Sequence, residues 1–274
     1  MKRVLVLVLV LVLAPASGCD DGLTKGWFVD RPRVLGVRIE ASVDPGRSTL
    51  AESEAGQLIW LVGSPAGTGR LTHTWAACLR PPGNFPEPQC EGPVLASGAG
   101  MSEGSLVTAP FTMPAVGDAK EVLVLAAFCT EGTPTLDPMG FQASCANGPA
   151  ILASALVRTE PTNRSPAPMG VLFDGQLVLA GACAAIVVPG TKHDVQVLFR
   201  PEDREDGETM IASHVVTGGQ LDRQYSAVEP LEPLPKEAKV PWTAPTEVRD
   251  VELFIVLRDG RGGTSFARHV LCVR

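Results

Sequence analysis

Apolar and polar residues alternate along several short segments of this chain, and few stretches repeat their apolar residues with the period of a helix. Side chains of a strand point alternately to its two faces, so this alternation predicts half-buried strands. In 71–78 it places Leu71, His73 and Trp75 on one face. Continuous apolar runs such as 121–129 predict buried strands. We therefore expect an all-β protein.

The expected strands follow one another along the chain, and segments rich in proline and glycine separate them. They are 34–43, 56–63, 71–78, 121–129, 150–158, 171–181, 193–200, 211–219, 251–257 and 264–273. The last two form the clearest hairpin. Their connection, 258–263, contains Asp259-Gly260 and Gly262-Gly263, which supply the positive φ angles that a tight turn needs.

A segment of proline and small polar residues, 159–168, interrupts this series and predicts an interdomain linker. With 274 residues the chain is long enough for two ordinary domains. We expect a first β domain over 34–160, a linker over 161–168 and a second β domain over 169–274. Residues 19–33 are expected to form a short polar tether before the first domain.

The N-terminus predicts export. Lys2 and Arg3 precede an unbroken apolar run over 4–14. As a helix, this run of 11 residues would span roughly 16 Å, which is far short of the bilayer core of about 30 Å. We therefore interpret 1–18 as a signal peptide and not as a transmembrane helix.

Small residues from Ala14 to Gly18 lead into Cys19, and this sequence resembles the lipobox of bacterial lipoproteins. The resemblance implies that the chain is cut before Cys19 and that this cysteine carries a diacylglyceryl group. Ala16 stands where that family usually has leucine. The alternative is an ordinary secretory signal with an unmodified Cys19.

The lipoprotein resemblance implies a membrane anchor in the cell envelope, facing the periplasm or the surface. Asp20 resembles an inner-membrane retention signal, but that signal varies among bacterial groups, so the choice between inner and outer membrane stays open. Loss of 1–18 leaves 21 basic and 30 acidic side chains, a net charge of −9. Clustered positive charge is what phosphate backbones select, so nucleic acid is not expected as a partner.

Six cysteines remain after Cys19, and an exported chain meets an oxidising environment, so we expect three disulfides. These cysteines are Cys78, Cys90, Cys129, Cys145, Cys183 and Cys272. If the two halves fold separately, the last two must pair with each other. The first four allow three pairings. We favour Cys78–Cys90 and Cys129–Cys145, in which each loop is rich in proline and glycine; the alternative is a Cys78–Cys129 bridge between sheets.

A Thr-Ala-Pro sequence at 108–110 and again at 243–245 precedes an apolar strand by a similar gap, and Trp75 lies on an early strand. This arrangement resembles immunoglobulin-like or PKD-like β-sandwich domains in tandem. The resemblance implies that Trp75 is a core residue. The corresponding strand of the second half, 193–200, has no tryptophan. The whole chain also resembles exported lipoproteins of high-GC Gram-negative bacteria.

No catalytic or metal-binding motif is visible, so we predict no catalytic residues, no metal ligands and no cofactor. The four histidines stand singly on expected strands and are interpreted as packed or surface residues: His73, His193, His214 and His269. The acidic run 202–208 could supply oxygen ligands to calcium, but a solvated loop is the simpler interpretation. A proline series from Pro230 to Pro245 predicts an extended crossover along a sheet edge.

These features favour a lipid-anchored, non-catalytic interaction or structural module of the cell envelope. One alternative is an accessory subunit that binds carbohydrate or protein, which the aromatic content of 5% disfavours because sugar platforms need exposed aromatic rings. Another alternative is an envelope enzyme whose site is assembled from distant residues. Fold resemblance cannot decide among them, because β-sandwiches support many functions.

Overall fold

The prediction of an all-β protein is confirmed. The computed structural model describes residues 25–81, 88–166, 170–179, 181, 183–199 and 204–274, and nearly all regular structure in these ranges is β-strand. The single helical element of these described residues is the short 3₁₀ turn η1, Gly117–Ala119. Within the same ranges, no helix is long and apolar enough to cross a bilayer. The expected signal peptide, residues 1–18, and the expected lipidation site, Cys19, lie outside the described residues.

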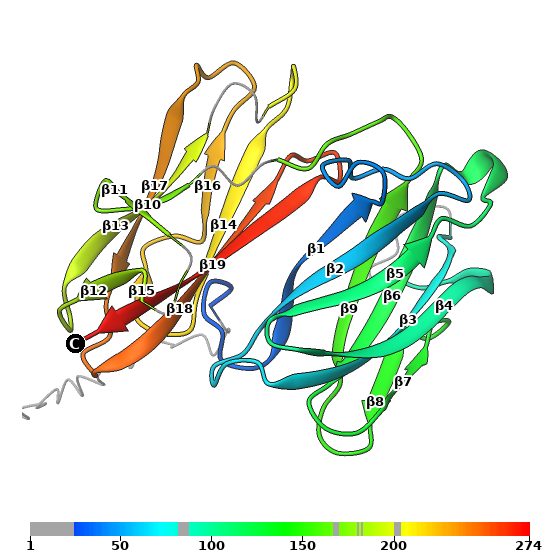
Figure 1. The fold of residues 1–274 in the computed structure, drawn as a ribbon, viewed down its shortest axis with the longest axis horizontal. Coiled ribbons are helices and arrows are strands. Elements are labelled where there is room, and N and C mark those ends of the chain that lie inside the picture. Colours follow the sequence, from blue (N-terminus) through cyan, green and yellow to red (C-terminus); the bar gives the residue numbers. More distant parts are fainter. Residues whose placement is uncertain (1–24, 82–87, 167–169, 180, 182, 200–203) are drawn as a thin grey trace, which may run out of the picture.

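The first half of the chain forms a sandwich of two antiparallel sheets (Figure 1). One sheet has the order β1-β2-β5 and the other has the order β4-β3-β6-β9. Their bounds are β1 Arg33–Ala41, β2 Ala55–Gly63, β3 Arg70–Leu79, β4 Glu91–Glu103, β5 Leu106–Thr112, β6 Glu121–Cys129 and β9 Ile151–Arg158. A small hairpin of β7 Pro134–Asp137 and β8 Gln142–Cys145 lies between β6 and β9 in the chain.

The second half forms another sandwich, with sheets ordered β11-β10-β13-β17-β15 and β12-β19-β18-β14-β16. In chain order the strands are β10 Val171–Phe173, β11 Gln176–Val178, β12 Ala185–Val187, β13 Lys192–Phe199, β14 Met210–Val216, β15 Gln220–Leu221, β16 Tyr225–Val228, β17 Lys236–Thr243, β18 Arg249–Arg258 and β19 Thr264–Val273. Strand β12 pairs with β19 in parallel, whereas the other pairs in this sandwich are antiparallel. Immunoglobulin domains divide their strands between two sheets in a comparable order.

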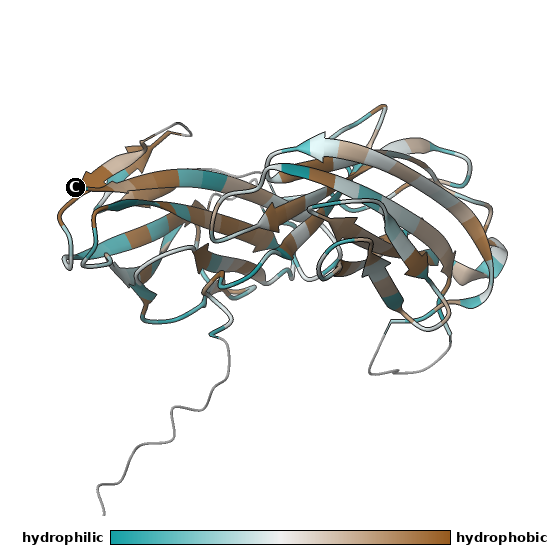
Figure 2. Ribbon diagram, turned by 90° about the horizontal axis from the view of Figure 1, so that it is seen from below, coloured by the Kyte–Doolittle hydropathy of each residue, from teal (hydrophilic) through white to brown (hydrophobic). Residues whose placement is uncertain are grey.

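Each sandwich has its own hydrophobic core, built mainly from aliphatic side chains around a few aromatic rings. Figure 2 shows the long hydrophobic stretches of the strands. In the first core, Trp60 and Trp75 are both buried, as the sequence predicted for Trp75. In the second core, the large buried ring is Trp242 on β17, whose indole N–H donates to the Gly218 carbonyl at 3.0 Å. Trp242 was not predicted, because the strand that was expected to correspond to that of Trp75 was 193–200, which contains no tryptophan.

Two expected elements differ in the structure. The segment 171–181, expected as one strand, is the hairpin of β10 and β11, because Asp174 and Gly175 both adopt positive φ and reverse the chain. The proline series was expected along a sheet edge, yet β17 lies inside its sheet between β13 and β15. The Pro241 carbonyl accepts from the Asp222 N–H, so the backbone of Pro241 faces β15 and not β13. Its missing N–H is tolerated because β15 has only two residues and leaves this part of the β17 backbone without a ladder partner.

Three disulfides join the cysteines in the pairs that the sequence favoured: Cys78–Cys90, Cys129–Cys145 and Cys183–Cys272, with Cα–Cα distances of 5.5, 5.8 and 5.6 Å. The alternative Cys78–Cys129 bridge is excluded by register. Both residues lie on adjacent strands of one sheet, but Cys78 pairs with Leu123 and Cys129 pairs with Thr72, at opposite ends of the β3–β6 pair.

Candidate functional site

The two sandwiches meet at an apolar joint. Ile59 and Leu61 of β2 pack against Val215, Phe254 and Val256 of the second sandwich, and Val29, Leu35 and Phe266 complete the same cluster. This contact explains why 58–62 and 253–257 are continuous apolar runs. Alternate residues of each strand face the core of their own sandwich, and the residues between them face the other sandwich.

Residues before β1 also take part in the joint. The sequence assigned 19–33 to a polar tether, but within its described part the Val29 N–H donates to the Val216 carbonyl at 2.9 Å, and the Val216 N–H donates to the Trp27 carbonyl at 2.9 Å. Val29 is fully buried. The chain is therefore attached to the second sandwich just before it enters the first.

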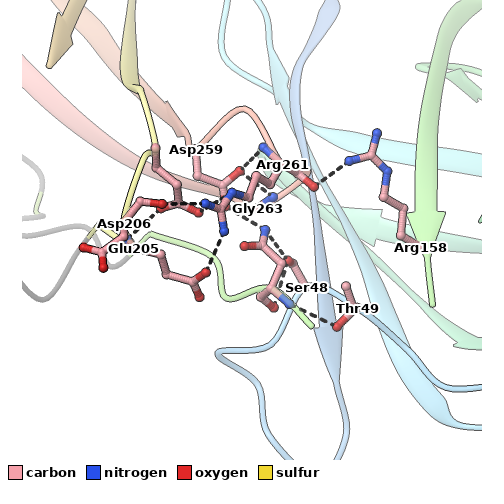
Figure 3. A network of polar contacts seen from close by, with 10 residues as sticks. Ser48, Thr49, Arg158, Glu205, Asp206, Asp259, Arg261 and Gly263 are labelled. Atoms are coloured by element: carbon pink, nitrogen blue, oxygen red, sulfur yellow. Dashed lines mark hydrogen bonds and ion pairs between the residues drawn. The ribbon is translucent and has the colours of Figure 1, made fainter. Parts of the chain in front are cut away.

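The expected linker 161–168 takes part in the joint within its described part, which ends at residue 166. Asn163 is buried, and its side-chain amide donates to Asp259 Oδ2 at 2.7 Å and to Ser48 Oγ at 3.2 Å (Figure 3). The backbone carbonyl of Asn163 accepts from the Ser48 N–H at 2.9 Å, and the backbone N–H of Asn163 donates to Thr49 Oγ1 at 3.4 Å. Ser48 belongs to the first sandwich and Asp259 to the second, so this one side chain connects both.

The turn between β18 and β19 holds Asp259 in the position where it accepts from Asn163. Asp259 Oδ1 accepts from the backbone N–H groups of Arg261 at 2.7 Å and Gly263 at 2.9 Å. Position 263 must be glycine, because an added Cβ would lie 2.0 Å from Asp259 Oδ2 and 2.7 Å from the Arg164 carbonyl. From the first sandwich, Arg158 Nη1 donates to the Arg261 carbonyl at 2.7 Å. The turn is thus fixed from both sides of the joint.

The described part of the acidic run packs onto the same turn. Arg261 pairs with Glu205 at 2.8 Å and with Glu208 at 3.4 Å, and its Nη2 donates to the Asp206 carbonyl at 2.8 Å (Figure 3). Burial raises the pKa of the Glu208 carboxyl. Residues 202 and 203 lie outside the described part of the chain. Among the described residues, no group of three or more His, Cys, Asp or Glu side chains is placed to hold a metal ion.

A groove of about 500 Å³ runs along the joint. Its walls come from β1, from the edge strand β9 and from the second sandwich around the β18–β19 turn. Backbone and small side chains dominate the lining near the turn, where Gly260, Gly262 and Gly263 face it. We call this feature the joint groove, and it is the candidate functional site because both sandwiches are needed to form it.

Two arginines bring positive charge to the joint groove. Arg258 Nη1 donates to Ser213 Oγ at 3.0 Å and its Nη2 donates to the Leu35 carbonyl at 2.9 Å, but no carboxylate of the described residues pairs with it. Burial lowers the pKa of its guanidinium from the ordinary value. Arg158 also lines the groove and pairs with Glu121 at 3.3 Å. The groove therefore contains one guanidinium, that of Arg258, without a carboxylate partner among the described residues.

One histidine lies in a hydrogen-bonded chain that resembles a catalytic relay. His193 Nδ1 is 2.7 Å from Asp174 Oδ2, and its Nε2 is 2.6 Å from Thr191 Oγ1. The Thr191 hydroxyl is also 2.6 Å from the Val188 carbonyl, and the imidazole stacks on Phe173. These contacts connect the β10–β11 turn to β13.

The other three histidines are packed residues, as the sequence indicated. His73 lies among Trp60 and Phe128 in the first core, and burial lowers its pKa. His214 bonds to Ser226 Oγ at 2.9 Å, and burial lowers its pKa to about 4. Burial also lowers the pKa of His269.

The aromatic rings of the described residues lie mostly within the cores and the joint. Tyr225 is the exposed one, with a fractional exposure of 54%. A sugar platform needs several exposed rings side by side, and the described surface does not offer that arrangement. The joint groove was missed from the sequence because its walls come from segments more than 100 residues apart. Asp259 and Arg261 were interpreted only as turn residues.

Comparison with known proteins leaves the family open, since no family model and no curated protein matches the chain. Solved structures with some likeness include red sea bream transglutaminase, with 12% identity and a TM-score of 0.27 over 88% of this chain and 32% of that one. Escherichia coli alpha-2-macroglobulin activated by porcine elastase has 9% identity and a TM-score of 0.25 over 88% and 22%. Yersinia pseudotuberculosis adhesin InvE has 12% identity and a TM-score of 0.24 over 86% and 58%.

Proposed function

We propose that this protein is a lipid-anchored, non-catalytic binding module of the bacterial cell envelope, and that the joint groove is its ligand site. The observation that carries the proposal is the joint itself. A buried apolar cluster and the Asn163 contacts hold two sandwiches together, and the groove exists only in that arrangement. A site built between two rigid units is preformed, which lowers the entropy lost on binding.

The anchor part of the proposal rests on the lipobox-like sequence before Cys19 and is supported by three disulfides, which form in oxidising compartments. Intact-mass analysis of protein extracted from membranes tests it. We expect a chain that begins at Cys19 and carries acyl groups, and a Cys19→Ser variant found in the soluble fraction. An unmodified wild-type chain in the soluble fraction would contradict the anchor.

The non-catalytic part is tested with purified protein and a panel of ester, glycoside and peptide substrates. We expect no turnover above background from the wild type or from a His193→Ala variant. Turnover by the wild type that His193→Ala abolishes would overturn the proposal in favour of an enzyme, with the Asp174–His193–Thr191 chain as its site. A matched His73→Gln variant controls for general loss of a histidine.

A further inference from the structure

The two sandwiches differ at one sheet edge. In the first sandwich the sheet ends at β9, in the order β4-β3-β6-β9. In the second, the order β16-β14-β18-β19 is followed by one more strand, β12. Strand β12 pairs in parallel with the last three residues of the final strand, from Leu271 to Val273. The corresponding place beside β9 lies in the joint groove.

The outer edge of β9 presents unpaired backbone groups. The Thr159 N–H donates to the Lys120 carbonyl, whereas the Arg158 carbonyl accepts from the Leu50 N–H on the other side, away from β6. Because backbone direction alternates along a strand, Leu152, Ser154 and Leu156 direct their N–H and C=O groups to this outer side. Within the described residues, no backbone partner pairs with these three on that side.

Other edges carry protection that β9 lacks. Strand β4 begins and ends with glutamate and contains Pro93, and the edge strand β5 contains Pro110. Proline and charge are the usual means of preventing strand addition at a sheet edge. Between Ile151 and Val157, β9 has neither a proline nor a charged residue. Its edge is therefore open to an added strand.

Charge indicates which kind of strand fits. The joint groove contains Arg158, which pairs with Glu121, and the half-buried Arg258, with which no carboxylate of the described residues pairs. A partly buried guanidinium without a counter-charge is stabilised by a ligand that supplies the opposite charge. A second copy of β9 would instead bring another Arg158 and Arg258 to the same place, and like charges at close range are destabilising.

We propose that an extended, acidic segment of a partner polypeptide adds to the outer edge of β9 within the joint groove, as β12 adds to β19. This inference rests on the proposed binding function and names the class of ligand. Main-chain hydrogen bonds to Leu152, Ser154 and Leu156 supply affinity, and carboxylates that meet Arg158 and Arg258 supply preference.

The test uses two synthetic peptides with capped ends. Both carry Ala-Ala-Ile-Val-Val, the sequence of residues 184–188, which include β12. One peptide has an aspartate on each side of this sequence and the other has a lysine on each side. Titration into the isotope-labelled mature chain is followed by amide chemical shifts. We expect the aspartate peptide to bind about tenfold more tightly than the lysine peptide at low salt, and to shift the amides of 152, 154 and 156.

The matched variants are Ser154→Pro and Ser154→Ala. The proline removes the outward N–H of β9 and leaves its bonds to β6 in place, so we expect the fold to be retained. We expect Ser154→Pro to weaken the aspartate peptide at least about tenfold and Ser154→Ala to leave it unchanged; thermal unfolding checks that both variants fold. The inference would be overturned if Ser154→Pro bound the aspartate peptide as tightly as the wild type does, if the two peptides bound the wild type equally, or if neither peptide bound. It would also be overturned if the wild type formed a dimer that Ser154→Pro dissociates. None of these results bears on anchoring or turnover, which test the proposed function separately.

Discussion

We expect the replacement of Asn163 by alanine to lower the free energy of unfolding by more than a substitution in a solvated linker usually does. The change removes the charge-assisted hydrogen bond to Asp259 at 2.7 Å and the neutral hydrogen bond to Ser48 at 3.2 Å. Such bonds contribute about 1.5–3 and about 1 kcal/mol, respectively. Asp259 keeps its two backbone donors, so it does not become an unpaired buried charge. The free energy of unfolding should therefore fall by about 2–4 kcal/mol.

The assay is thermal and urea unfolding of the mature chain under non-reducing conditions. For a chain of this size, each kcal/mol should lower the Tm by about 2–4 °C. Asn147→Ala is the matched control, because Asn147 is exposed in the loop before β9 and should change stability by less than about 0.5 kcal/mol. If Asn163→Ala and Asn147→Ala unfold alike, the linker does not hold the joint and the reasoning fails.

Three further predictions concern the second sandwich. The pKa of His214 is about 4 in the fold and 6.5 in the unfolded chain, so the unfolded state binds the proton more tightly. The free energy of unfolding should therefore be highest above pH 6.5 and fall by about 3 kcal/mol as the pH is lowered to 4. In urea titrations, His214→Gln should show a smaller loss over this pH range. Gly219→Ala should cost about 2–4 kcal/mol and Gly175→Ala about 1 kcal/mol, because both have φ of +77° but only the former Cβ clashes, 2.3 Å from a backbone oxygen; equal melting temperatures would refute the clash. Replacing Cys183 and Cys272 by serine opens a loop of 89 residues and should cost about 4–5 kcal/mol in chemical denaturation, and a loss below about 1 kcal/mol would contradict the chain-entropy argument.

The strands of the cores could be predicted from the sequence because they carry their own pattern. The expected hairpin of 251–257 and 264–273 matches β18 and β19, since its two apolar runs and its glycine turn are local signals. Strand β4 was not expected. Its residues are mostly exposed, rich in glycine and serine, and show no apolar period, so its place in the sheet depends on pairing with β3.

The candidate site could not be predicted in the same way, because no part of it is local. Asn163 stands among prolines and serines and is typical of a solvated linker, yet its partners Ser48 and Asp259 are 115 and 96 residues away in the chain. Arg258 was part of an expected turn, and only the packing of two sandwiches turns it into a charge inside a groove. The open edge of β9 is visible only when the two sheets are compared.

A fixed joint is the central claim, since the joint groove exists only if the two sandwiches keep one orientation. Spin labels placed through noncanonical amino acids at Met139 in the first sandwich and Leu231 in the second would measure this directly, because both side chains are exposed. We predict a single narrow distribution of distances between the labels that does not change with salt, and a broader one in Asn163→Ala. A broad distribution in the wild type would contradict the account.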